Sequence, residues 1–142
     1  MKKPFKSTLG VTLLEVMLVL AIAAMIVVMS VRYYQSANQN SQANTFVEQI
    51  GAITAGVENL TQGTGDYTNK ASLATLTNFV PANMLTQVPW GGGATYAATA
   101  SGYTFTAATA ASANLCALFT QKLVSDNHYT VTCSVVTYSG NK

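Results

Sequence analysis

Apolar residues form one unbroken run near the start of the chain. In the 21 residues from Val11 to Val31, Glu15 is the only charged residue, and neither glycine nor proline occurs. As a helix this run is about 31 Å long, which is enough to cross the hydrocarbon of a bilayer. Lysines precede the run and Arg32 follows it. The positive-inside rule therefore predicts a membrane-spanning helix whose N-terminus is cytoplasmic.

Beyond Val31 the apolar residues become periodic. No proline interrupts this part, and its first glycines are Gly51 and Gly56, which we expect to allow close packing on a sheet. The i, i+3, i+4 and i+7 spacing of one helix face is matched by Tyr34, Ala37, Ala43, Phe46, Val47, Ile50, Ile53 and Val57. The pattern predicts one helix from about Thr12 to Leu60, apolar all round in its first part and amphipathic in its second.

Turn-forming residues then separate shorter elements. Gln62–Asn69 is rich in Gly, Asp and Asn, which predicts a loop. Ser72–Phe79 predicts a short helix with Ser72 as its N-cap. A turn-rich stretch follows and ends at Gly91–Gly93, where three glycines stop any regular element.

The last third of the chain predicts strands around one helix. Ala94–Ala98 and Tyr103–Ala107 flank Ser101-Gly102, which indicates a hairpin with Tyr103 and Phe105 on one face. The alternating, β-branched segment Tyr129–Val136 predicts a final strand. Between them, Ser112 is expected to cap a helix that runs to about Ser125 with a stripe of Leu115, Leu118, Phe119 and Leu123. The fold class is therefore α+β, with the long helix packed on a small antiparallel sheet.

The charge distribution argues against a nucleic-acid partner. The net charge is +2, but Lys2, Lys3 and Lys6 supply three of the seven basic residues. From Val11 onward four basic residues stand against five acidic ones, a balance of −1. Without a basic patch we predict no nucleic-acid binding. Charged residues make up only 8% of the chain, which suits an extracellular structural protein better than a cytosolic enzyme.

The two cysteines, Cys116 and Cys133, both follow the predicted span. An even number of cysteines on the oxidising side of a membrane favours a disulfide, here between the predicted helix and the predicted final strand. The bond would close an 18-residue segment and contribute about 3 kcal/mol in the chain-entropy model. The alternative is a pair of buried free thiols.

Glu15 requires an explanation, because a charge at the centre of a membrane span costs about 2.5–3.5 kcal/mol and somewhat less near its edge. One interpretation is an ordinary anchor whose glutamate snorkels to the interface. A second is a cleaved signal peptide, since Ala21-Ile22-Ala23 fits ordinary signal-peptidase cleavage. That product would be freely secreted, but Glu15 would lie inside its apolar core and its new end would be apolar.

The N-terminus resembles the class III signal of type IV pilins. The matching residues, which precede the apolar run or lie at its start, are Lys2, Lys3, Lys6, Gly10, Val11 and Glu15. The resemblance implies that a prepilin peptidase cuts after Gly10 and that Val11 becomes the N-methylated first residue. It also implies that Glu15 pairs with the Val11 amine of a neighbouring subunit during assembly, where a low dielectric strengthens the attraction.

Three later segments resemble type IVb pilins, especially the major pilins of conjugative thin pili. They are Val80–Met84, Pro89–Gly92 and Asn114–Cys116. The chain departs from these families in its short leader, in a first mature residue that is not Phe, and in Arg32, where many type IVa pilins carry a proline.

The resemblance implies a domain organisation and a function. Residues 1–10 would be the leader, 11–31 the transmembrane and assembly half of the long helix, 32–60 its amphipathic half, and 61–142 a globular α+β head. The precursor would reside in the bacterial inner membrane. A pilus assembly platform would then build a homopolymer, an extracellular type IV pilus for adhesion, aggregation or mating-pair contact. The alternatives are a type II secretion pseudopilin and a minor pilin that primes or caps the fibre.

No set of residues indicates catalysis. The single histidine, His128, is expected in a turn, and a Cys116–His128 nucleophile would require Cys133 to be unpaired. No metal-ligand spacing occurs, and Gly91–Gly93 lacks the lysine and hydroxyl residue of a phosphate loop. We therefore predict no enzyme activity, no cofactor and no metal site.

Overall fold

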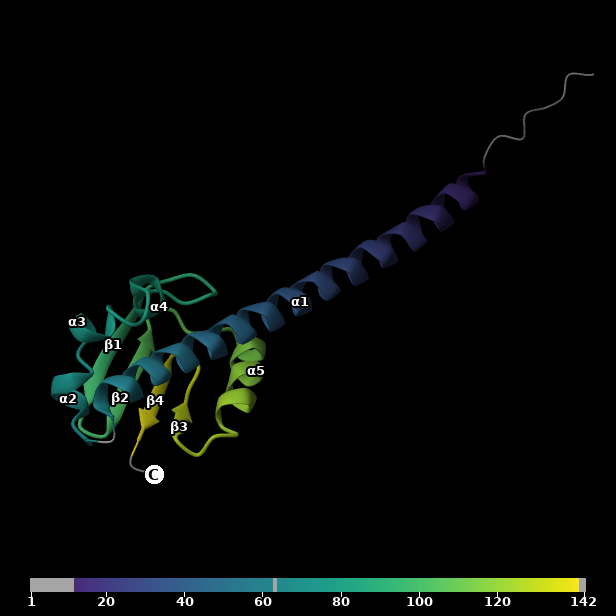
Figure 1. The fold of residues 1–142 in the computed structure, drawn as a ribbon. Coiled ribbons are helices and arrows are strands. Elements are labelled where there is room, and N and C mark those ends of the chain that lie inside the picture. The colour runs from purple at the N-terminus through teal and green to yellow at the C-terminus, as the bar shows by residue number, and fades with distance from the viewer. Residues whose placement is uncertain (1–11, 63, 141–142) are drawn as a thin grey trace, which may run out of the picture. The chain divides into compact units, whose positions relative to one another are not determined.

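The computed structural model describes residues 12–62 and 64–140. The chain divides into two compact units after Ala37, and the first helix contributes residues to both. The helices and strands (Figure 1) are α1 Leu13–Thr61, α2 Tyr67–Lys70, α3 Leu73–Leu76, α4 Ala82–Thr86, β1 Ala94–Thr99, β2 Gly102–Ala107, α5 Ala113–Leu123, β3 Tyr129–Val131 and β4 Val135–Ser139.

The long helix was expected over Thr12–Leu60, and α1 confirms it to within one residue at each end. In the second unit α1 buries one stripe, spaced by three or four residues as the amphipathic pattern predicts. Its fully covered apolar side chains include Phe46, Ile50, Ile53 and Val57, each at most 2% exposed. Burial of this stripe is what attaches α1 to the rest of the unit.

The four strands form one antiparallel sheet in the order β1-β2-β4-β3. The predicted hairpin is confirmed as β1 and β2, and Tyr103 and Phe105 are both buried on its inner face. The second part of α1 lies across this face (Figure 1), with the Thr54 hydroxyl 2.7 Å from the Tyr103 hydroxyl. The architecture is therefore α+β, with a long apolar N-terminal helix and a small antiparallel sheet.

The prediction of a single final strand over Tyr129–Val136 was wrong. The segment forms two strands, β3 and β4, joined by a turn that contains Cys133. Val131 pairs with Val136 across this turn, and the turn is closed by the Thr132 N–H, which donates to the Val135 carbonyl at 2.8 Å. The side chains that pack on the core switch from the odd positions Tyr129 and Val131 to the even positions Val136 and Tyr138. One continuous strand cannot accommodate this switch, because its side chains alternate strictly between faces.

Two shorter segments also differ from expectation. The predicted loop Gln62–Asn69 contains the start of α2, because the Asp66 carboxylate accepts from the Asn69 N–H at 3.3 Å and caps the turn. The helix expected over Ser72–Phe79 is only Leu73–Leu76, and the Ser72 hydroxyl pairs with that of Thr75 instead of capping a backbone N–H.

The last predicted helix is present as α5, which buries most of its expected apolar stripe. Leu115, Phe119 and Leu123 are buried, whereas Leu118 is only partly buried. Ser112 is the N-cap residue, but its side chain makes no capping hydrogen bond.

Gly56 packs against the α3 region and not against the sheet as expected. A Cβ at Gly56 would lie 2.9 Å from both Leu76 Cδ1 and Val80 Cγ2, whereas nothing lies within 4 Å of a Cβ at Gly51. We expect Gly56→Ala to lower the free energy of unfolding by about 1–2 kcal/mol, because overpacking exceeds the gain in helix propensity.

The matched control for this prediction is Gly51→Ala, which should raise the free energy of unfolding by about 0.5–1 kcal/mol. Both variants would be measured by denaturant titration of the detergent-solubilised chain, with fluorescence from its single tryptophan. Shifts of the same sign in the two variants would contradict the packing argument.

Candidate functional site

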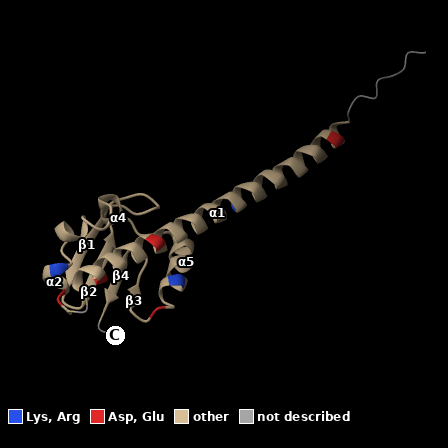
Figure 2. Cartoon of the chain, in the orientation of Figure 1, with Lys and Arg blue, Asp and Glu red and all other residues tan. Residues whose placement is uncertain are grey.

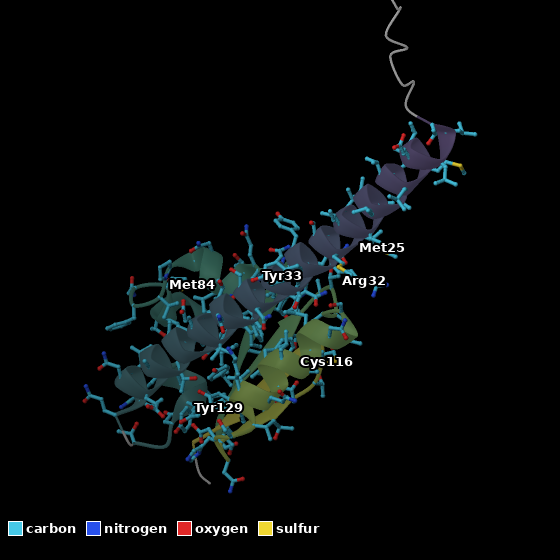
Figure 3. All side chains as sticks on the ribbon, turned by 90° about the vertical axis from the view of Figure 1, so that its right-hand side faces the viewer. Met25, Arg32, Tyr33, Met84, Cys116 and Tyr129 are labelled. Atoms are coloured by element: carbon cyan, nitrogen blue, oxygen red, sulfur yellow. A yellow bond between two sulfur atoms is a disulfide. The ribbon has the colours of Figure 1, made fainter. Side chains whose placement is uncertain are left out.

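The candidate site begins with the apolar surface of α1 in the first unit. Every large apolar side chain that is described between Leu13 and Val31 is at least 43% exposed. Met25 and Tyr33 project away from the helix (Figure 3). No charged residue lies on α1 between Glu15 and Arg32 (Figure 2). Among the residues described, α1 is the one helix long and apolar enough to serve as a membrane anchor or a signal sequence.

Glu15 lies in the first turn of α1 and forms a reciprocal cap with Thr12. The Thr12 N–H donates to Glu15 Oε2 at 2.9 Å, and the Glu15 N–H donates to the Thr12 hydroxyl oxygen at 3.3 Å. This is the capping-box arrangement, which satisfies two backbone donors that a helix start otherwise leaves free. The sequence already carried its signature, Thr-x-x-Glu before an apolar run, and our sequence analysis missed it.

Gly10 and Val11, the predicted cleavage position and methylated residue, lie outside the described residues. Glu15 is therefore the one member of the predicted N-terminal set whose surroundings can be stated. Its carboxylate has a partner within its own chain, so a structural role for Glu15 as a helix cap stands beside the predicted role in assembly.

The predicted disulfide between Cys116 and Cys133 is present, with an S–S distance of 2.07 Å. It joins α5 to the β3–β4 turn and not to a strand as expected. Two backbone hydrogen bonds also anchor this turn: the Ala111 N–H donates to the Cys133 carbonyl at 2.9 Å, and the Ala107 N–H donates to the Ser134 carbonyl at 2.7 Å. The disulfide therefore adds α5 to a connection that backbone hydrogen bonds already make between β2, the segment before α5 and the final hairpin.

Removal of this disulfide should destabilise the second unit. We expect Cys116→Ser to lower the free energy of unfolding by about 2–5 kcal/mol, the usual loss in small disulfide-bonded domains. Trp90 fluorescence reports the transition, because the indole stacks on Phe119 with 5.8 Å between ring centroids.

The control is Cys133→Ser, which removes the same bond and should cost about as much. The double variant should cost little more than either single one, because the bond is lost only once. An unfolding midpoint equal to that of the unsubstituted chain would contradict a stabilising role for the bond.

One tyrosine from each strand forms a continuous row across the sheet, which the sequence did not reveal. The row follows the strand order as Tyr96, Tyr103, Tyr138 and Tyr129, with 5.5, 5.4 and 5.3 Å between successive ring centroids. The alternation of the strands placed Tyr103 on the inner face, but the neighbours of each ring depend on strand order and register.

The hydroxyl groups of this row bond to helices and loops above the sheet. Thr54 donates to the Ile50 carbonyl at 2.9 Å, which leaves its oxygen to accept from the Tyr103 and Tyr129 hydroxyls at 2.7 Å each. The Tyr138 hydroxyl donates to Glu58 on α1. The Tyr96 hydroxyl donates to the Ala71 carbonyl at 2.9 Å. Together these bonds fix the second part of α1 to three of the four strands.

Burial raises the pKa of every tyrosine in the row. It raises the pKa of Tyr96 to about 12 and places those of Tyr103 and Tyr129 above the ordinary value. The pKa of Tyr138 is raised by burial and by its hydrogen bond to the Glu58 carboxylate. Each hydroxyl is therefore held in its protonated form in the folded chain.

This row predicts a steep loss of stability at high pH. A raised pKa in the folded state means that the unfolded chain loses its tyrosine protons first, from about pH 10 upward. Each tyrosine then lowers the free energy of unfolding by up to ~1.4 kcal/mol per pH unit until its folded-state pKa is reached. We expect the chain to unfold cooperatively above pH ~10, with tyrosinate absorbance and Trp90 fluorescence changing together.

Tyr103→Phe is the control for the alkaline transition. This variant should lower the free energy of unfolding at neutral pH by about 1 kcal/mol, because a hydrogen bond is lost. The free energy of unfolding should then decrease less steeply with rising pH, because one titrating group is gone. Gradual tyrosine titration without a fluorescence change would contradict the prediction.

The other candidate residues do not assemble into a reaction centre. Nδ1 of His128 lies 2.8 Å from the Ser139 carbonyl oxygen, and the sulfur of Cys116 is bonded to Cys133. In the described residues no group of three or more His, Cys, Asp or Glu side chains could hold a metal ion.

A cavity of about 250 Å³ lies between α1 and the α4 region, in the second unit. Its wall includes Glu48, Met84 and Pro89. Gln49, which is only 5% exposed, donates to the Met84 carbonyl and, at 2.7 Å, to the Gln87 carbonyl. The buried amide therefore holds the α4 segment against α1.

No protein-family model matches this chain, and neither a curated protein nor a solved structure is significantly similar to it.

Proposed function

We propose that this chain is the precursor of a structural subunit of a type IV pilus, similar to the type IVb pilins. The observation that carries the proposal is the exposed apolar surface of α1 over Leu13–Val31. The single acidic residue of this segment, Glu15, lies in the first turn of α1, five positions after Gly10. An ordinary membrane anchor needs only the apolar surface. A charge within that surface is unfavourable, and the cap that Glu15 forms with Thr12 could also be made by an uncharged glutamine.

In such a subunit, the apolar surface would contact lipid before assembly and other subunits after it. An exposed apolar surface of this extent is unfavourable in water and marks contact with lipid or with other proteins. In the precursor, lipid of the inner membrane would cover Leu13–Val31, with the N-terminus cytoplasmic. In the pilus, the same surface would be covered by the equivalent helices of neighbouring subunits.

The charge on Glu15 would direct this second association. Cleavage after Gly10 would create a cationic amine on Val11, and an unpaired carboxylate in an apolar environment is strongly unfavourable. Pairing of Glu15 with the amine of a neighbouring copy would relieve that penalty and set the axial register of the helices. Apolar packing has no direction and could not set the register alone.

The second unit supplies what an extracellular fibre surface requires. Its α+β fold is compatible with that of a pilin head, and its disulfide suits an oxidising compartment. Its described charged residues are few and dispersed along the chain (Figure 2). We infer that this unit forms the outer surface of the pilus and makes the contacts that serve adhesion, aggregation or mating.

The test is to express the chain with a prepilin peptidase and a pilus assembly system, and then to sequence the N-terminus and image sheared material. A mature N-terminus at Val11 together with long surface fibres would support the proposal. An N-terminus at Ala24 would establish ordinary secretion instead. Cleavage at Val11 with incorporation only into a short periplasmic fibre would favour a type II secretion pseudopilin, and labelling confined to fibre ends would favour a minor pilin.

A further inference from the structure

The two cysteines of the disulfide differ in solvent exposure. Cys116 is 8% exposed and lies on α5 (Figure 3), next to the buried side chain of Leu115. Cys133 lies in the β3–β4 turn and is exposed, as is its neighbour Thr132. We propose that Cys133 is the point at which an external thiol, such as that of a thiol–disulfide oxidoreductase, exchanges with this bond.

The exchange reaction is a single displacement at sulfur. The thiolate of the external partner attacks Sγ of Cys133 along the axis of the disulfide. A new S–S bond forms between the partner and Cys133, the bond to Cys116 breaks, and its electron pair leaves on Sγ of Cys116, which then takes up a proton. Access selects the sulfur that is attacked, because an approach to Cys116 would first have to displace the side chains packed around α5.

The backbone keeps Cys133 available after the bond opens. The Cys133 and Ser134 carbonyls accept hydrogen bonds from Ala111 and Ala107, at 2.9 and 2.7 Å, and neither bond depends on the disulfide. The Cys116 N–H is likewise held by the Ser112 carbonyl at 2.8 Å, within the first turn of α5. The two cysteines therefore stay close, and the released Cys116 thiol can attack the mixed disulfide and restore the original bond.

The position of Lys122 between the two cysteines allows a direct test. Trypsin cuts after Lys122, which separates the cysteines onto the peptides 71–122 and 123–142. The full-length chain in detergent is incubated with reduced glutathione, and the reaction is quenched with iodoacetamide. The chain is then digested, and the masses of both peptides are measured by mass spectrometry. We expect glutathione mainly on the peptide 123–142 and the alkyl group mainly on the peptide 71–122.

The control is the same incubation in guanidinium chloride. There the two sulfurs are equally accessible, so glutathione should be divided nearly evenly between the two peptides. An even division in the native chain, or an excess on the peptide 71–122, would overturn the proposal. So would a native disulfide that stays intact as the glutathione concentration is raised, because excess glutathione competes with the return attack of the Cys116 thiol. Since this experiment requires neither cleavage at Gly10 nor fibres, its outcome is independent of the proposed pilin function.

Discussion

Glu15→Gln is expected to spare membrane insertion and cleavage but to remove most of the surface fibre. The substitution keeps the size of the side chain and deletes its charge. Insertion should become slightly easier, because a charge leaves the apolar segment. On the proposed function, assembly would lose the attraction between this carboxylate and the Val11 amine of a neighbouring copy, which would be strong in a low dielectric. The measurement is the ratio of sheared fibre to processed protein in the membrane.

Because of the capping box, Glu15→Gln tests the charge separately from the helix cap. A glutamine oxygen can still accept from the Thr12 N–H, since glutamine serves in this motif as glutamate does. A loss of fibre in Glu15→Gln therefore cannot be attributed to a frayed helix start. The matched control is Thr12→Val, which removes the capping hydroxyl and about 1 kcal/mol of helix stability while keeping the carboxylate.

The two proposed roles of Glu15 thus give opposite results. If pairing between subunits matters, Thr12→Val should still form fibres and Glu15→Gln should not. If Glu15 acts only as a cap, fibre loss should follow Thr12→Val, and Glu15→Gln should behave as the unsubstituted chain. A normal fibre ratio in Glu15→Gln would refute the pairing role.

Gly10→Val should give an unprocessed membrane protein and no fibre at all. A peptidase that approaches the backbone closely has no room for a side chain at this position, and glycine alone has none. Without cleavage no amine would form on Val11, so the proposed intersubunit partner of Glu15 would be absent. N-terminal sequencing and the change in mass on gel electrophoresis would measure processing directly.

Leu9→Val is the neighbouring control, since it introduces the same side chain one residue earlier and leaves Gly10 intact. It should be cleaved and should assemble. Recovery of a chain that begins at Val11 from the Gly10→Val variant would show that cleavage does not depend on the glycine, and would remove the main support for a class III signal.

The elements predicted correctly are those whose causes lie within a few residues of the chain. The bounds of α1 follow from an apolar run, then a helical period, with no proline to interrupt either. The hairpin of β1 and β2 follows from alternation on both sides of Ser101-Gly102. A Cβ at Gly102 would lie 2.0 Å from the Tyr138 carbonyl oxygen, so this glycine serves the neighbouring strand β4 as well as the turn.

The largest error, the single final strand, concerns a segment whose turn is held by distant residues. Tyr129–Val136 has the composition of one strand, and the turn at Cys133 is held by residues far earlier in the chain, since the Ala111 and Ala107 N–H groups donate to the Cys133 and Ser134 carbonyls. The start of α2 was missed although its cause was local, because a single Asp66 cap is a weak signal within a loop-like composition.

The sequence by itself determined the apolar run, the position of the one acidic residue within it and the two cysteines that are available to pair, because each of these follows from residue type and order alone. The tertiary structure decided which cysteine is exposed and which rings of the tyrosine row are neighbours. It also decided that the Thr54 hydroxyl accepts hydrogen bonds from two of these tyrosines, which lie 49 and 75 residues further along the chain. These contacts depend on strand order and register, which arise only when the α1 stripe and both hairpins are buried together.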